Sequence, residues 1–152
     1  IGKKLTTLLR PFNCKILARD HVTDMEFARE NNINYVHLDE LLKESDIVTL
    51  HLPLDNDTKG FFDRNLFLQM KDQAIFINTS RGKLVDEDGL YDVLSAGKIS
   101  HACLDVYNNE PYTGKLNELD NVTLTCHIGS YAKEARIKME EQAVENLLKG
   151  LG

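Results

Sequence analysis

The feature that most limits the fold is the alternation of short apolar segments with segments of helical periodicity along the whole chain. The apolar segments predict strands at residues 14–18, 35–37, 46–52, 74–78, 100–106 and 122–125. Helices are predicted at residues 3–10, 23–31, 38–45, 66–70, 86–96 and 131–149. Short apolar strands separated by helices are typical of βαβ units. The pattern therefore predicts an α/β fold with a doubly wound parallel sheet that helices cover on both faces.

Three residues are predicted to mark helix ends. Asp39 can cap the start of the helix at 38–45, because a short polar side chain accepts a hydrogen bond from a free amide of the first turn. Gly97 can end the helix at 86–96, and Ser130 is a candidate cap for the helix at 131–149. These residues give expected bounds for three of the helices.

The composition is that of an acidic globular domain. Hydrophobic residues make up 42% of the 152 residues and charged residues 28%, which excludes a disordered chain. The net charge of -6 argues against a nucleic-acid partner, because binding to phosphates requires a basic face. No apolar run is long enough to cross a membrane, and no linker divides the chain, so we predict one domain outside the membrane.

The three cysteines, Cys14, Cys103 and Cys126, are far apart in the sequence and lie in or beside apolar runs. Their spacing contains no pattern such as C-x-x-C, so we predict no metal site. We interpret them as buried free thiols, which are typical of a reducing compartment, and infer a cytoplasmic protein.

Polar residues gather where the predicted strands end. Asp20, His51, residues 79–81, Asp105 and His127 each lie at or just after the end of a strand. Ligands of parallel α/β sheets bind outside the carboxyl ends of the strands. The sequence therefore predicts a binding site along this edge of the sheet.

The first residues match the end of a glycine-rich turn of the Rossmann type. Gly2 directly precedes a helical segment, as the third glycine of G-x-G-x-x-G does, and Asp20 follows 18 positions later, near the spacing of the acidic residue that binds ribose. A glycine before a helix also serves ordinary tight packing. On the first interpretation, the first strand and the start of the turn are absent from the chain, and we expect a fragment of a longer protein.

Four motifs together carry a specific resemblance. Residues 51–54 (HLPL), 78–86 (NTSRGKLVD), 104–111 (LDVYNNEP) and 127–130 (HIGS) closely resemble the D-isomer-specific 2-hydroxy-acid dehydrogenase family. That family includes D-lactate, glyoxylate/hydroxypyruvate and D-3-phosphoglycerate dehydrogenases. The resemblance implies that residues 1–152 are an NAD-binding domain, incomplete at its N-terminus, whose substrate-side domain is not in this sequence.

The same resemblance implies hydride transfer between NAD(H) and C2 of a 2-hydroxy or 2-oxo acid. Arg81 would hold the substrate carboxylate through paired hydrogen bonds, and His127 would donate or accept the proton. Glu110 would bind the other ring nitrogen of His127 and fix its tautomer. Two ordinary alternatives stay open: Arg81 could be a surface residue paired with Asp86 or Glu87, and the histidine could be structural.

The cofactor residues are also implied by the resemblance. Ile1 and Gly2 would meet the pyrophosphate, and Asp20 would bind the ribose, which favours NAD over NADP, although the neighbouring Arg19 leaves room for NADP. Asp105 would accept a hydrogen bond from the nicotinamide carboxamide; Asp20 and Asp105 could instead be turn residues. The remaining contacts implied are Leu52, Pro53, Thr79, Ser80, Arg81, His127, Ile128, Gly129 and Ser130.

Two further expectations concern the whole protein. Relatives of this kind are commonly homodimers, so we expect a homodimer. The alternative to an enzyme is a nucleotide-sensing corepressor of the same family that does not turn over metabolites. A formate dehydrogenase is disfavoured by Glu110, where those enzymes have glutamine. Cys126 stands where the family commonly has proline, and it removes no catalytic group.

Overall fold

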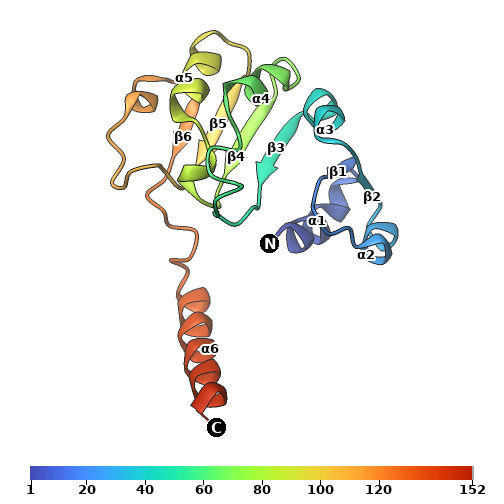
Figure 1. Cartoon of the computed structure of the whole chain (residues 1–152), viewed down its shortest axis with the longest axis vertical. Helices are drawn as coiled ribbons and strands as arrows, with labels where there is room; N and C mark the ends of the chain where they lie inside the picture. The colour runs from blue at the N-terminus through green and yellow to red at the C-terminus, as the bar shows by residue number, and fades with distance from the viewer. Residues whose placement is uncertain (152) are drawn as a thin grey trace.

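The computed structural model describes residues 1–151 and contains two parallel sheets. The first sheet pairs β1 with β2, and the second has the order β3-β4-β5-β6. The strands are β1 (Ile16–Ala18), β2 (Ile33–Tyr35), β3 (Ile47–Leu50), β4 (Ile75–Asn78), β5 (His101–Leu104) and β6 (Val122–Leu124). Parallel strands separated by helices confirm the α/β, Rossmann-like class (Figure 1).

Helices separate and flank the strands. The α-helices are α1 (Gly2–Leu9), α2 (Met25–Glu30), α3 (Leu38–Glu44), α4 (Arg64–Gln69), α5 (Glu87–Ser95) and α6 (Lys133–Leu151). Three short 3-10 helices add η1 (Arg10–Phe12), η2 (Gly82–Leu84) and η3 (Lys115–Glu118). No helix among residues 1–151 has both the length and the apolar character needed to span a membrane.

The core of the four-stranded sheet lies on one face. Side chains alternate along β3, β4 and β5, and those on one side, such as Val48, Phe76 and Ala102, are buried. Phe67 of α4 and Leu90 of α5 belong to the same buried cluster, so both helices pack on this face. On the opposite side of the sheet the side chains are half-buried or exposed.

The single predicted sheet is divided in two. Neither β1 nor β3 has a second strand partner among the described residues, and the two strands are not paired with each other. The β1–β2 unit, with α1 and α2, lies beside the larger sheet in Figure 1 and is not bonded to it as a strand neighbour. The sequence pattern gives strand positions, whereas pairing depends on which edges come into contact.

Strand ends differ from the predicted bounds for identifiable reasons. The strand predicted at 35–37 is β2, because only residues 33–35 lie opposite the short strand β1. The strand predicted at 46–52 ends at Leu50, whose carbonyl accepts a hydrogen bond from the Ser80 hydroxyl at 2.7 Å. This side-chain bond takes the place of a further ladder bond.

Two predicted caps are wrong, and one is displaced by a residue. His37 is the N-cap of α3, and Asp39 lies in its first turn, where a negative charge favours the helix dipole. Helix α6 begins at Lys133, so Ser130 lies outside it. Gly97 follows the C-cap Ala96 and has the left-handed conformation (φ 71°) that glycine adopts without strain.

The interpretation of the cysteines as buried is wrong for this structure. Cys14 and Cys126 are exposed, Cys103 is half-buried, and all three are free thiols. Cys103 lies on β5 and faces the less buried side of the sheet. Its neighbours in sequence, Ala102 and Leu104, face the buried core on the opposite side. Position in an apolar run therefore does not fix burial, because a strand has two faces.

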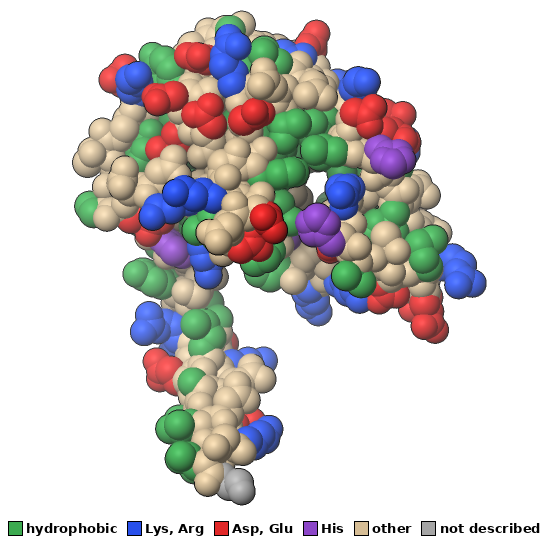
Figure 2. All heavy atoms as spheres, in the orientation of Figure 1, with side chains coloured by type: hydrophobic (Ala, Val, Ile, Leu, Met, Phe, Trp, Pro, Cys, Tyr) green, Lys and Arg blue, Asp and Glu red, His purple; other side chains and the backbone are tan. Residues whose placement is uncertain are grey.

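Helix α6 extends away from both sheets and none of its residues is buried (Figure 1). Several apolar side chains of this helix are visible on its surface in Figure 2. Leu147, Leu148 and Leu151 are each more than half exposed. The helix therefore contributes nothing to the core described above.

We predict that Phe76→Ala destabilises the four-stranded sheet by about 3–5 kcal/mol, the cost of a large cavity in a core. Phe76 is fully buried, and its ring lies 4.8 Å from the Phe62 ring and 4.9 Å from the Phe67 ring, between centroids. Hydrogen exchange of the β4 amides in the intact protein measures this loss. The matched control Phe12→Ala removes a ring that is 76% exposed and should change the same exchange by less than about 0.5 kcal/mol. Equal effects of the two changes would contradict the assigned core.

Candidate active site

The candidate site is built at the carboxyl edge of the four-stranded sheet. Leu50, Asn78, Leu104 and Leu124 are paired in one row across β3, β4, β5 and β6. Each strand ends at that row, so the loops that follow all leave the sheet at the same edge. The register therefore brings together the polar residues predicted at the ends of these four strands, whereas Asp20 follows β1 of the other sheet.

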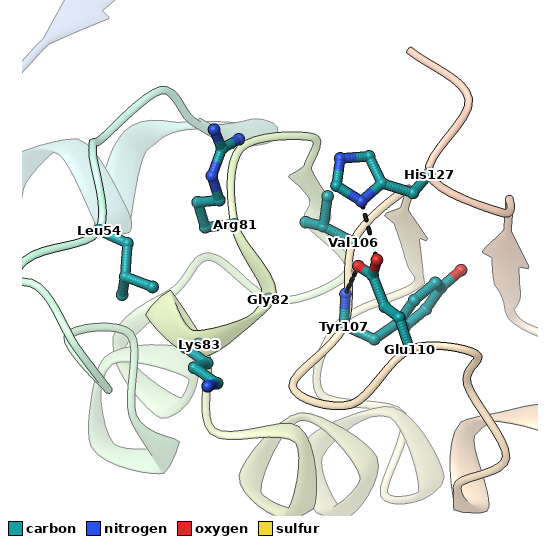
Figure 3. Close-up of a pocket in the computed structure, with 8 residues that line it drawn as sticks. All are labelled: Leu54, Arg81, Gly82, Lys83, Val106, Tyr107, Glu110 and His127. Atoms are coloured by element: carbon teal, nitrogen blue, oxygen red, sulfur yellow. Dashed lines mark hydrogen bonds and ion pairs between the residues drawn. The ribbon is translucent and has the colours of Figure 1, made fainter. Parts of the chain in front are cut away.

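Arg81, Glu110 and His127 line one pocket of about 240 Å³ (Figure 3). They come from the loops after β4, β5 and β6, respectively. The rest of the lining consists of Leu54, Gly82, Lys83, Val106 and Tyr107. The three residues singled out from the sequence are thus neighbours in space, although 46 positions (127 − 81) separate the first from the last.

His127 and Glu110 form a hydrogen-bonded pair. The distance between Nδ1 of His127 and Oε2 of Glu110 is 2.9 Å, and both side chains are partly exposed. The hydrogen bond to His127, and next the bond from the Tyr107 amide, lower the pKa of Glu110 from its usual value. A carboxylate on Nδ1 leaves Nε2 as the free ring nitrogen, and that nitrogen faces the Arg81 side of the pocket in Figure 3.

Asp105 holds the loop that carries His127. Its carboxylate accepts hydrogen bonds from the amides of Ile128 and Gly129, each at 2.9 Å, and from the Thr125 hydroxyl at 2.5 Å. Burial raises the pKa of Asp105, but these three hydrogen bonds and the nearby His127 together lower it, so the pKa lies below its usual value. His127 has a left-handed backbone (φ 55°), an uncommon conformation that the bonds on either side stabilise.

Arg81 is free to bind a ligand. Among residues 1–151 its guanidinium forms no ion pair, and the one hydrogen bond that the guanidinium donates goes to the Ser80 carbonyl at 2.6 Å. The alternative of pairing with Asp86 or Glu87 is not observed. Asp86 caps α5 by accepting from the Gly89 amide, and Glu87 accepts from the Asn108 amide at 2.6 Å.

The neighbours of Arg81 have different surroundings. Ser80 is buried, and its hydroxyl joins the end of β4 to the Leu50 carbonyl of β3. Thr79 is exposed at the edge. Ser80 therefore supports the loop from beneath, while Thr79 and Arg81 face outward.

The residues expected to hold a dinucleotide lie at both sheets. Helix α1 begins at Gly2, and its N-cap Ile1 gives the first turn no side-chain hydrogen bond. An added Cβ on Gly2 would lie 3.8 Å from Cδ2 of His51, so the start of α1 lies against the loop after β3. The exposed carboxylate of Asp20 uses only Oδ1, which accepts from the Val22 amide at 3.3 Å. A helix start with free amides and an available acid after β1 fit a dinucleotide.

Other predicted cofactor contacts stay predictions. Leu52 is half-buried and packs against the core, and the Pro53 carbonyl accepts from the Thr58 hydroxyl at 2.7 Å. Ile128, Gly129 and Ser130 follow His127 on the loop that Asp105 binds. Because Asp105 already accepts three internal hydrogen bonds, a bond from a carboxamide would be a fourth.

Five residues of the pocket lining received no role from the sequence: Leu54, Gly82, Lys83, Val106 and Tyr107. All five lie inside the four motifs described above, and this was the only indication in the sequence that they could line the pocket. The spacing of the motifs did not indicate which of these side chains face the pocket, because loops have no fixed periodicity.

The fold and the site define a class: a Rossmann-like α/β domain with a hydrogen-bonded histidine–glutamate pair and, among the described residues, an arginine without an ion pair at the strand ends. The family described as D-isomer specific 2-hydroxyacid dehydrogenase, NAD binding domain, matches residues 1–129. The chain belongs to this family.

Individual relatives agree with this assignment. The chain is 39% identical to a glyoxylate reductase of Korarchaeum cryptofilum, covering 97% of this chain and 45% of the relative. It is also 39% identical to a hydroxypyruvate reductase of Thermotoga maritima, covering 100% and 50%. The solved structure of D-lactate dehydrogenase from Aquifex aeolicus, complexed with NAD and lactic acid, superposes with a TM-score of 0.86 at 32% identity, covering 99% and 51%. The chain thus spans about half the length of the relatives it matches.

We predict that Asp105→Ala destabilises the intact protein by about 2 kcal/mol near neutral pH, because it leaves three donors without an acceptor. The pKa of Asp105 is depressed in the folded state, so its contribution is present above the unfolded value of about 3.9 and is lost as pH falls further. Unfolding free energies of wild type and variant should therefore differ from pH 5 upward and converge in stronger acid, roughly below pH 3. Asp120→Ala, which removes an exposed carboxylate, is the matched control. A constant difference across the whole pH range would contradict this account.

Proposed function

We propose that the protein containing this chain is an oxidoreductase that transfers a hydride between NAD(H) and C2 of a small 2-hydroxy or 2-oxo acid. The observation that carries the proposal is the juxtaposition of the His127–Glu110 pair with the unpaired guanidinium of Arg81 in one pocket. A proton donor and a carboxylate-binding cation are the two groups that reduction of a 2-oxo acid requires besides the hydride.

Each of the three residues has a distinct task in the proposed reaction. Arg81 binds the carboxylate by paired hydrogen bonds and so orients the carbonyl of the substrate. His127 donates a proton from Nε2 to the oxygen that becomes the hydroxyl. Glu110, bound to Nδ1, keeps that ring oriented and stabilises its protonated form. In the oxidation direction the proton returns to Nε2.

The nicotinamide cofactor supplies the hydride when it is bound. The free amides at the start of α1 would meet the pyrophosphate, and the Asp20 carboxylate would bind the ribose hydroxyls. A carboxylate at this position repels a 2′-phosphate, which favours NAD over NADP.

The pocket suits a small substrate. Its volume is about 240 Å³, and Leu54 and Val106 are the aliphatic side chains of its lining. A compact 2-oxo acid can present its carboxylate to Arg81 and its side chain to these apolar groups. Glyoxylate, hydroxypyruvate, pyruvate and 3-phosphohydroxypyruvate are the substrates to compare.

We also propose a homodimer in a reducing, cytoplasmic compartment. Three free cysteines support the reducing compartment, because no disulfide joins them. The homodimer follows from the family resemblance, and sedimentation of the intact protein tests it.

We predict that the intact protein oxidises NADH with one or more of these four acids, and that His127→Asn lowers kcat by about 100-fold or more, because asparagine cannot transfer the proton. His101→Asn is the matched control. His101 bonds the Thr123 hydroxyl at 2.9 Å, and it is the first residue of β5, at the end opposite the pocket. Full activity of His127→Asn would overturn the role of His127. NADH binding by wild type without turnover of any acid would favour the alternative, a nucleotide-sensing corepressor.

We predict that Arg81→Lys raises the KM for the 2-oxo acid about tenfold or more and leaves NADH binding unchanged. Lysine keeps the charge but loses the planar fork that binds a carboxylate through two hydrogen bonds. Steady-state kinetics and NADH fluorescence titration measure the two effects. Lys83→Arg, a cation exchange on the same pocket lining, is the comparison variant and should change KM less. An unchanged KM in Arg81→Lys would exclude Arg81 as the carboxylate ligand.

A further inference from the structure

Tyr107 bonds Glu110 and the segment that precedes His127 through separate atoms. Its backbone amide donates a hydrogen bond to Oε1 of Glu110 at 3.1 Å, the carboxylate oxygen that His127 does not use. Its hydroxyl lies 2.7 Å from the carbonyl of Thr125, two residues before His127, and 3.1 Å from the carbonyl of Leu104. One residue therefore joins the loop of Glu110 to the end of the strand that leads to His127.

The position of Tyr107 is itself fixed from two sides. An added Cβ on Gly82 would lie 1.9 Å from the carbonyl carbon of Tyr107, so the loop after Arg81 lies directly against the Tyr107 backbone. The Tyr107 ring stacks on the Tyr112 ring with centroids 4.6 Å apart. The residue is buried, at 7% exposure, whereas His127 and Glu110 are partly open to solvent.

The hydroxyl of Tyr107 is protonated near neutral pH and can donate a hydrogen bond. Burial raises the pKa of Tyr107 above its usual value of about 10. The shorter contact, to Thr125, takes the hydroxyl hydrogen. A phenylalanine ring would fill the same space and leave the Thr125 carbonyl without this donor.

We propose that Tyr107 is a positioning residue that sets the distance and orientation of His127 relative to Glu110 through its hydroxyl bond to Thr125. The proposal rests on the proposed function for its catalytic consequence, but the geometry that it describes exists without turnover. Neither partner of the pair is held by burial, so the bonds of their loops are what fix the 2.9 Å contact.

The charged surroundings of His127 limit what else could orient it. Glu110 binds its ring, the buried Asp105 carboxylate lies below its loop, and Arg81 and Lys83 line the same pocket. Asp105 binds the backbone amides after His127 and the Thr125 hydroxyl before it, and Tyr107 binds the Thr125 carbonyl. Loss of the Tyr107 hydroxyl should therefore loosen the segment before His127 in part and leave the protein folded.

The test compares Tyr107→Phe with wild type in the intact protein, labelled with ¹⁵N-histidine. We expect the ring nitrogen signals of His127, assigned with His127→Asn, to lose the pattern of an Nδ1 that donates to a carboxylate. In the reduction assay, kcat should fall about two- to tenfold, the factor for one neutral hydrogen bond, with an unchanged KM for NADH.

Tyr112→Phe is the matched control, because it also removes one hydroxyl from the stacked pair. The Tyr112 hydroxyl accepts from the Leu116 amide at 3.2 Å and is not bonded to the His127 strand. Its ¹⁵N spectrum and kcat should match those of wild type. Unchanged His127 signals in Tyr107→Phe would overturn the proposal, as would equal changes in both variants. Absence of turnover in wild type would contradict the proposed function alone, because the ¹⁵N signals test the positioning role without activity.

Discussion

The parallel register of β3 to β6 is the constraint on which the site depends. Leu50, Asn78, Leu104 and Leu124 occupy one row, so three loops bring Arg81, Glu110 and His127 to a common edge. The row is held by a core on a single face of the sheet. A shift of one strand by a single residue would turn its buried side chains to the opposite face, and the hydrophobic cluster therefore also fixes the positions of the loops.

Hydrogen bonds between neighbouring segments fix the positions of the loops that follow the strands. The Ser80 hydroxyl joins the end of β4 to β3, the Tyr107 hydroxyl joins the loop after β5 to β6, and Asp105 binds the loop after β6. In each of these bonds the side chain of a buried residue is paired with a backbone group of the adjacent segment. A backbone group is present whatever side chains the adjacent loop carries. These bonds can therefore hold loops whose own polar side chains are exposed.

The sequence predicts the parts of this structure that follow from local pattern. The grouping of His51, Arg81, Asp105 and His127 could be predicted from the sequence, because each follows a strand and parallel strands end at the same edge of a sheet. The division into two sheets could not be predicted, since it depends on which strand edges come into contact. The exposure of Cys103 depends on which face of β5 it occupies. The contact of Tyr107 with Thr125 joins residues 18 positions apart in irregular segments, where no periodicity relates them.

The exposure of the His127–Glu110 pair determines how strongly its two side chains interact. The His127 side chain is 47% exposed and the Glu110 side chain 38%, so water screens their interaction in the free protein. Two charges about 4 Å apart interact by about 1 kcal/mol in water and by about 4 kcal/mol at the dielectric constant near a protein surface. In the proposed reaction, a substrate held by Arg81 and a cofactor beside it would displace this water. The same 2.9 Å contact would then stabilise an imidazolium more strongly at the step for which we propose proton transfer.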